Sequence, residues 1–297
     1  WHPLAGFKDH RLDLNVMTVW LEQYKPERFD DLLTTPQVAD ALKHLALQAN
    51  PPHLLLSGPT GCGKTAALQL VCRQVLGPAW RATTHVLQAR DLDKTAGAMA
   101  RFEAFLRPEG VGSEDTLAGR TSLDAFDHNI SASADRSPPP AGEESPAPSS
   151  GTFAAVSRII VIEDADYLGH ARQSYLRRMM EDSSRSARFI FTTHTPSRII
   201  EALRSRTQHV RMPSLTRLMI EQRLENIAVA EGLQPVQGVL GDIAHVASGN
   251  LRKAIFTFQI LARRGLLGDR KNIQLLMANS SRREVQLVLE LSLIHIS

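Results

Sequence analysis

The eight-residue segment GPTGCGKT, residues 58–65, has the composition and spacing of a loop that binds phosphate groups. The apolar run PHLLL precedes it and the helical pattern AALQLVCRQVL follows it, which is the context that such a loop requires. Its glycines let successive backbone N–H groups point at phosphate oxygens, and the helix N-terminus adds partial positive charge. The segment therefore predicts a nucleotide site. Its candidate residues are Gly58, Pro59, Thr60, Gly61, Cys62, Gly63, Lys64 and Thr65.

Three side chains of this loop have particular expected roles. We expect Lys64 to reach the β- and γ-phosphates and the Thr65 hydroxyl to bind Mg²⁺. Cys62 allows two interpretations: a thiol that the helix N-terminus makes redox-sensitive, or a side chain that simply points away from the nucleotide. The alternative for the whole loop is a glycine-rich turn without a ligand, which the complete pattern in this context disfavours.

Carboxylates supply a second group of candidate residues. Glu163, Asp164 and Asp166 directly follow the β-branched run IIVI. Mg²⁺ prefers oxygen ligands and keeps several waters, so one of these acids could support a metal ion. The other interpretation is an acidic turn after a buried strand. The phosphate loop upstream favours a site for a metal ion and a water nucleophile.

The elements that position these residues follow from the hydrophobic pattern. Apolar runs around residues 53–57, 158–164 and 188–194 are typical of buried strands. Helical patterns such as ARQSYLRRMMED and PSRIIEALRSR lie between strands, and this alternation favours an α/β fold with a parallel sheet and flanking helices. After Met212 the chain has helical segments separated by glycine, which predict a small all-helical lid domain.

The expected domain organisation follows the same changes of character. Residues 17–211 are expected to form the nucleotide-binding domain and residues 212–268 the helical domain. Residues 107–153 are rich in Pro, Ser and Gly, which predicts a disordered insertion. Met17 and the residues after it resemble a natural start, so we expect residues 1–16 to be a non-native leader. We expect residues 269–297 to begin a further helical element that is truncated or has a non-native end.

Composition limits the classes of function. The 297-residue chain is 43% hydrophobic and 22% charged, an ordinary soluble composition. No apolar run approaches the roughly 18 residues of a membrane span, and the N-terminus lacks the layout of a secretion signal. The two cysteines can form neither a disulfide framework nor a four-ligand zinc site. We therefore expect a cytoplasmic or nuclear protein, neither secreted nor bound to a membrane. The net charge of +3 permits nucleic-acid binding without demanding it.

Five motifs in order resemble a known family. They are WLEQYKPERFDDLL, PHLLLSGPTGCGKT, IIVIEDAD, RFIFTTHTPSRIIEALRSRT and GNLRKAI. Together they resemble the AAA+ clamp-loader ATPases, most of all the small subunit of replication factor C, over residues 19–263 apart from the insertion. The resemblance implies a Rossmann-like P-loop domain, a helical lid and a helical collar. It also implies ATP and Mg²⁺ as ligands, with sister subunits of a hetero-pentamer, a sliding clamp and primer–template DNA as partners.

The resemblance assigns roles to further residues. Tyr24, Lys25 and Pro26 of EQYKP are expected beside the adenine. Arg206 of SRT resembles the arginine finger that acts in trans on a neighbour's γ-phosphate, and its planar permanent cation suits that role. Arg252 of GNLRKAI resembles the lid arginine that senses the γ-phosphate.

Two further groups of basic residues are candidates for contacts with partners. Arg177 and Arg178 resemble a family helix at the subunit boundary. Arg90, Lys94 and Arg101 lie where the family has a helix that follows the DNA backbone, and charge and position make them candidate DNA contacts.

The chain departs from the family pattern at two points of the expected site. The family has Asp-Glu at the strand end where this chain has Glu163-Asp164. Glu163 can still support Mg²⁺. Asp164 is one methylene shorter than the family's glutamate, and a displacement of about 1 Å in a catalytic group can cost about a hundredfold in rate. His194 stands where the family usually has Asn, and an imidazole differs in hydrogen bonding and titration. We therefore expect ATP binding to survive and hydrolysis to be weakened.

Three functions compete on this evidence. The first is an ATP-hydrolysing clamp-loader small subunit that helps to load a sliding clamp onto primed DNA during replication. The second is a nucleotide-binding structural subunit of a hetero-oligomeric AAA+ assembly, with negligible turnover of its own. The third is another AAA+ enzyme, such as a helicase loader, against which EQYKP and SRT argue.

Overall fold

The computed structural model describes residues 19–92, 97–106, 156–182 and 187–268. The predicted leader, insertion and final segment lie outside these ranges, and so does Lys94. In the described part of the chain, none of the helices combines the length and the apolar character that a membrane span requires.

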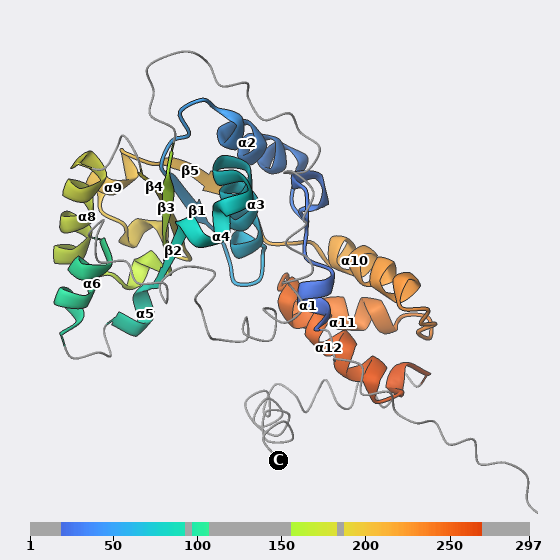
Figure 1. The fold of residues 1–297 in the computed structure, drawn as a ribbon. Coiled ribbons are helices and arrows are strands. Elements are labelled where there is room, and N and C mark those ends of the chain that lie inside the picture. Colours follow the sequence, from blue (N-terminus) through green and yellow to red (C-terminus); the bar gives the residue numbers. More distant parts are fainter. Residues whose placement is uncertain (1–18, 93–96, 107–155, 183–186, 269–297) are drawn as a thin grey trace, which may run out of the picture.

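The centre of the fold is a five-stranded parallel sheet (Figure 1). Its strands are β1 (Leu54–Ser57), β2 (Thr84–Gln88), β3 (Arg158–Glu163), β4 (Ala187–Thr193) and β5 (Gln208–Arg211). Their order across the sheet is β2-β3-β4-β1-β5, with every pair parallel. The predicted parallel α/β fold is therefore confirmed. Because parallel strands end at one edge, the segments that follow β1, β3 and β4 meet there.

The strands are apolar throughout because both faces of the sheet are covered. Leu54 and Leu56 pack into one buried cluster and Leu55 into another, as the period of two along a strand requires. The helices α2 (Pro36–Leu47), α3 (Lys64–Leu76) and α4 (Trp80–Thr83) contribute to the first cluster. The second cluster receives side chains from α5 (Ala89–Leu92), α6 (Ala98–Leu106), α8 (His170–Asp182) and α9 (Glu201–Arg204). Short 3₁₀ turns lie at Phe29–Asp31, Gly77–Ala79, Ala165–Tyr167, Pro196–Arg198 and Leu266–Gly268.

A separate hydrophobic core lies among the helices that follow Met212. These helices are α10 (Arg217–Ala230), α11 (Val239–Ala247) and α12 (Leu251–Arg263). The side chains of Thr216 and Asn250 cap α10 and α12 by accepting hydrogen bonds from Met219 N at 3.2 Å and Lys253 N at 3.1 Å. The predicted helical region is confirmed, whereas its division from the sheet domain at residue 212 stays a prediction.

The N-terminal helix α1 (Trp20–Gln23) belongs to this second core, although it lies far from α10 in the sequence. Figure 1 shows α1 beside α11 and α12, away from the sheet. Trp20 is buried against Phe258 of α12, with the two ring centroids 5.2 Å apart. The segment that leads from α1 to the sheet domain therefore begins on the helical core.

Candidate functional site

The phosphate loop joins the end of β1 to the start of α3. Gly61 and Gly63 have φ angles of 75° and 99°, which an L side chain adopts only with strain. A Cβ atom at Gly58 would lie 2.4 Å from the carbonyl oxygen of Met212, so the chain after β5 closes against the loop. The loop thus has the tight backbone geometry that phosphate binding by N–H groups requires.

Lys64 is the first residue of α3, directly after the glycines of the phosphate loop, and 8% of its surface is exposed. Its ammonium donates hydrogen bonds to the carbonyl oxygens of Gly58 and Pro59, each at 2.8 Å. Burial lowers the pKa of Lys64, and the carboxylates of Asp164 and Asp166 oppose that shift. The ammonium is therefore held by neutral carbonyl groups, which a phosphate can replace with stronger, charge-assisted bonds.

Cys62 is buried, with 1% of its surface exposed. Burial raises the pKa of its thiol, and the nearby charge of Lys64 only partly opposes this effect. A buried thiol with a raised pKa is a poor nucleophile, so the structure supports the interpretation in which Cys62 points away from the nucleotide.

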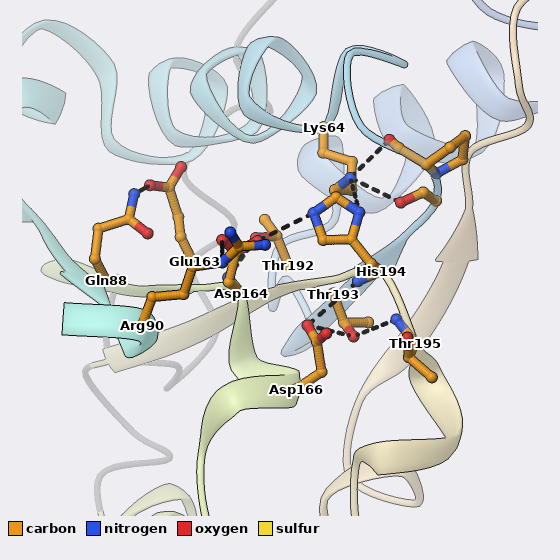
Figure 2. Close-up of polar contacts among 12 residues, drawn as sticks. Lys64, Gln88, Arg90, Glu163, Asp164, Asp166, Thr192, Thr193, His194 and Thr195 are labelled. Carbon is orange, nitrogen blue, oxygen red and sulfur yellow. Dashed lines mark hydrogen bonds and ion pairs between the residues drawn. The ribbon is translucent and has the colours of Figure 1, made fainter. Parts of the chain in front are cut away.

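The two exchanged acids, Glu163 and Asp164, lie at the end of β3 and have different partners (Figure 2). Glu163 accepts a hydrogen bond from the side-chain amide of Gln88, which ends β2. Asp164 has a left-handed backbone, with φ 53° and ψ 45°, and its N–H donates to Thr192 Oγ1 at 3.1 Å. This conformation turns the Asp164 side chain toward β4 and α5.

Both carboxylate oxygens of Asp164 are engaged (Figure 2). Arg90 Nε lies 2.8 Å from Oδ2, and His194 Nε2 lies 3.2 Å from Oδ1. The guanidinium of Arg90 also stacks 4.4 Å from the ring centroid of Tyr167. Charge and position in the sequence predict a DNA contact for Arg90, whereas in the structure its guanidinium lies in the site and binds Asp164.

His194 directly follows β4 and joins the acid to the phosphate loop. Its Nδ1 atom lies 3.5 Å from Lys64 Nζ, on the side of the ring opposite Asp164. Its backbone N–H donates to Asp166 Oδ1 at 3.3 Å, and the Thr193 hydroxyl donates to the same oxygen at 3.0 Å. Asp166, which has no specific role assigned from the sequence, is thus a buried carboxylate that fixes the end of β4.

The helical core closes the other side of the site. Leu251 N–H, at the start of α12, donates to the carbonyl oxygen of Gly61 at 3.1 Å. Asn250 lies directly over this glycine, because a Cβ atom at Gly61 would be 1.9 Å from Asn250 Oδ1. The N-termini of α3 and α12 therefore both face the region where phosphate groups are expected, and each adds partial positive charge.

The EQYKP segment is anchored on the helical core. The Tyr24 hydroxyl donates to Glu231 Oε1 at 2.5 Å, and Arg223 Nη2 donates to the Tyr24 carbonyl oxygen at 2.6 Å. Trp20 N–H donates to Gln259 Oε1 at 3.3 Å. Burial and the Glu231 carboxylate raise the pKa of Tyr24 to about 12. The segment is therefore positioned by α10 and α12 rather than by the sheet.

These elements enclose a cavity of about 570 Å³. The predicted nucleotide-site residues that line it are Tyr24, Lys25, Pro26, Thr60, Gly61, Gly63, Lys64, Thr65, Glu163, Asp164, His194 and Arg252. Gly58, Pro59 and Cys62 belong to the loop but not to the cavity wall. The wall also contains residues that the sequence motifs do not predict, among them Leu21, Glu22, Gln69, Gln88, Thr192, Leu251 and Ile255. Gln88 and Thr192 could have been predicted from sequence, because they lie at or near the carboxyl ends of parallel strands, where ligands commonly bind.

Arg206 does not line the cavity of its own chain. Its guanidinium binds Glu181 at the end of α8, with Nη2 at 2.6 Å, and donates to the Ala202 carbonyl oxygen at 2.9 Å. Its side chain is 36% exposed, so it is accessible from outside. This position suits the predicted action in trans. The side chain of Arg101 is not among those that the structure describes.

The oxygen ligands present fit a magnesium ion that arrives with a nucleotide. Among the described residues there is no group of three or more His, Cys, Asp or Glu side chains that could hold a metal ion. Mg²⁺ at nucleotide sites commonly takes only one or two carboxylates, with phosphates and waters as the other ligands. Thr65 and Glu163 line one cavity and supply a hydroxyl and a carboxylate.

Comparison with known proteins gives three concordant results. Residues 54–215, more than half of the chain, match the model of the ATPase family associated with various cellular activities (AAA). The chain is 29% identical to the replication factor C small subunit of Methanoculleus marisnigri over 93% of this chain and 73% of that protein. It is 27% identical to the replication factor C small subunit of Natronomonas pharaonis over 90% of this chain and 70% of that protein.

A comparison of structures agrees on the fold. The RuvB Holliday junction branch migration motor of Thermotoga maritima superimposes with a TM-score of 0.57 and 17% identity, covering 86% of this chain and 72% of that one. A RuvB variant from the same organism gives a TM-score of 0.57 at 16% identity, with the same coverage of the two chains. At these identities the likeness shows the fold alone. With the family match and the cavity formed by phosphate loop, acids and helical core, the chain belongs to the AAA family of ATPases.

Proposed function

We propose that this chain is an ATP-hydrolysing small subunit of a clamp loader. The observation that carries the proposal is the cavity in which Lys64, the Glu163–Asp164 pair and Arg252 come together from three elements. The similarity to replication factor C small subunits supports the rest. Its proposed partners are sister subunits of a hetero-pentamer, a sliding clamp and primer–template DNA, and its proposed place of action is inside the cell, at sites of replication.

The proposed roles within the site follow from the chemistry of each group. Lys64 would exchange the carbonyls of Gly58 and Pro59 for the β- and γ-phosphate oxygens, because charge-assisted bonds are stronger. Thr65 and Glu163 would hold Mg²⁺, which neutralises charge on the phosphates when bound. Arg252 would reach the γ-phosphate from α12, and Tyr24 with its neighbours would flank the adenine.

Arg206 is proposed to act on the neighbouring subunit. Its distance from its own cavity and its partly exposed guanidinium support this role. Glu181 holds it through two nitrogen atoms, Nε at 2.9 Å and Nη2 at 2.6 Å, which keeps the guanidinium oriented before assembly. Arg177 and Arg178, on the exposed side of α8, lie on the same helix as Glu181 and are proposed to face that neighbour. Lys94 and Arg101 remain proposed DNA contacts.

The experiment that tests this function is ATP hydrolysis by the chain alone, and then with sister subunits, clamp and primed DNA. Wild type is compared with Lys64→Ala and Arg206→Ala, and Arg264→Ala at the exposed end of α12 is the matched control. We expect partners to stimulate turnover, and Lys64→Ala to remove the part that this chain contributes. Turnover that is insensitive to Lys64→Ala, with or without partners, contradicts an ATPase site here.

One observation favours the second candidate, a nucleotide-holding subunit with negligible turnover. Both oxygens of Asp164 are already bound, by Arg90 and His194, so this carboxylate is not free to activate water. In that case Lys64→Ala would leave the turnover of the assembly unchanged, and Arg206→Ala would silence it through the neighbouring site. This alternative also predicts that the chain itself binds ATP and does not hydrolyse it.

A further inference from the structure

His194 contacts Asp164 through one nitrogen atom of its ring and Lys64 through the other (Figure 2). Nε2 lies 3.2 Å from Asp164 Oδ1, and Nδ1 lies 3.5 Å from Lys64 Nζ. Its imidazole side chain is only 25% exposed, and the backbone N–H beside it is held by Asp166. The ring is therefore fixed between a carboxylate on one side and the position of the phosphates on the other.

The tautomer of His194 follows from its two partners, Asp164 and Lys64. A carboxylate accepts hydrogen bonds, so Nε2 must carry a proton to donate to Asp164. An ammonium only donates, so Nδ1 must be unprotonated to face Lys64. These two contacts fit a neutral imidazole whose proton is on Nε2 and whose Nδ1 lone pair faces Lys64.

Asp164 is poorly suited to take a proton from water itself. Its Oδ2 is bound by Arg90 at 2.8 Å and its Oδ1 by His194 at 3.2 Å, so both oxygens already accept contacts from other side chains. It is also one methylene shorter than glutamate, so its oxygens end closer to β3. What it can do from this position is orient the imidazole and stabilise the imidazolium that forms when the ring accepts a proton.

We propose that His194 is the general base of ATP hydrolysis in this chain and that Asp164 is its positioning residue. The inference rests on the proposed function and deepens it. When the γ-phosphate takes over the ammonium of Lys64, Nδ1 loses its present neighbour and faces a water beside the phosphorus. In this chain the proposed base is therefore the residue after β4, and not the acid at the end of β3.

The proposed step transfers the γ-phosphoryl group of ATP to water. The water oxygen forms a bond to Pγ while its proton passes to Nδ1 of His194. The bond between Pγ and the β–γ bridging oxygen breaks, and its electron pair leaves with ADP. The imidazolium, stabilised by Asp164, then returns its proton to solvent after phosphate departs.

Several charged groups face the ring and its two partners. Lys64 comes from α3, Asp164 from the end of β3, and Asp166 from the following turn. Arg90 of α5 acts through Asp164, and Arg252 of α12 lies near Lys64. In the proposed function the nucleotide adds negative charge beside these groups and draws Lys64 away from Nδ1.

The kinetic test uses the full chain assembled with sister subunits whose own phosphate-loop lysines are changed to alanine, so that only this site turns over. His194→Asn keeps a side-chain donor but removes the base. We expect its single-turnover rate to fall by about a hundredfold or more, with the binding of a fluorescent ATP analogue changed less than about threefold. His245→Asn, on the exposed side of α11, is the control and should match wild type.

The pH profile separates a base from a merely structural histidine. For wild type we expect the rate to fall about tenfold per unit of pH at the acid end of the range of about 5 to 8, and for His194→Asn this dependence should vanish. The second variant, His194→Asn with Asp164→Glu, restores the glutamate base and should regain part of the rate. A rate and pH profile unchanged in His194→Asn, or raised by that change alone, would overturn the proposal.

The tautomer of His194 tests the positioning role of Asp164 without a measurement of ATP turnover. Imidazole ¹⁵N resonances of the full chain, with His194 identified by its absence from His194→Asn, should show a proton on Nε2 and none on Nδ1 at neutral pH. Asp164→Asn should abolish this preference. A wild-type ring protonated on Nδ1 contradicts the inference. If Lys64→Ala leaves turnover unchanged, the proposed function fails and this inference with it; if Lys64→Ala abolishes turnover and His194→Asn does not reduce it, only this inference fails.

Discussion

Arg90 and Asp164 both line the cavity and form an ion pair of 2.8 Å; Arg90 follows the end of β2 and Asp164 follows the end of β3. Strands β2 and β3 are neighbours, with Gln88 in register with Glu163, so the residues that follow them meet. The pair places a permanent cation on the carboxylate that belongs to the expected catalytic strand end. Because of this ion pair, Asp164 differs from a carboxylate whose oxygens are both free to bind water.

Replacing Arg90 by alanine tests what this cation does. Half of its side chain is exposed, so the pair is partly screened and its loss should leave folding unchanged. Without Arg90, Asp164 should stabilise an imidazolium at His194 better, and we expect ATP turnover to rise by about two- to fivefold. Single-turnover hydrolysis measures this, with Arg264→Ala as the control; a fall in turnover would instead place Arg90 on the phosphates.

Gly61 tests the contact between the phosphate loop and the helical core. Gly61→Ala places a methyl group against Asn250 and strains a backbone with φ 75°. We expect ATP affinity to fall by about tenfold or more, because α12 can no longer approach the loop. Gly77→Ala is the matched control, since φ is 64° there and nothing lies within 4 Å of the added atom. Nucleotide titration distinguishes the two, and equal affinities would show that the Asn250 contact is unimportant.

Trp20 tests the anchoring of the N-terminal segment. Its ring is 7% exposed and packs on Phe258, so Trp20→Ala should lower the free energy of unfolding by about 3 kcal/mol or more. The same change should weaken ATP binding, because the helix α1, which leads into Tyr24 to Pro26, loses its packing on α12. Urea unfolding and nucleotide titration of the full chain measure the two effects. Trp20→Phe, which retains an aromatic contact, should recover most of both, and a stability loss with unchanged affinity would separate the anchor from the site.

His53 gives a prediction about pH and stability. Burial, and then the charge of Arg188, lower its pKa to about 4, and its Nδ1 accepts a hydrogen bond from Phe189 N–H at 3.0 Å. Its ordinary pKa is 6.5, so below that value the unfolded chain binds more protons and stability falls as pH decreases toward 4. Between pH 7.5 and 5 we expect a loss of about 2 kcal/mol at this position.

The measurement for His53 is urea unfolding at both pH values. His53→Gln keeps an acceptor near Phe189 N–H but does not titrate, so its stability should change less between the two conditions than that of wild type. His44→Gln, on the exposed surface of α2, is the control. An identical pH dependence in wild type and His53→Gln would show that another group is responsible.

The phosphate loop and the buried strands could be predicted from sequence because each depends on residues that are close along the chain. GPTGCGKT carries its own glycines, lysine and helix start, and the runs around β1, β3 and β4 are apolar because both of their faces are covered. The position of His194 after β4 followed from the same local pattern. Short strands such as β5, with three of four residues exposed, lack that pattern and were not predicted.

The remaining relationships were decided by tertiary structure. Arg90 meets Asp164 only because the strand order places β2 beside β3, and the sequence distance between them gives no indication of this. Trp20 meets Phe258 because the N-terminal helix packs on helices that follow the last strand, and Asn250 meets Gly61 because that helical core packs against the phosphate loop. Residue types and spacing thus determined which chemistry is available, whereas strand order and long-range packing decided which base, cation and acid face one another.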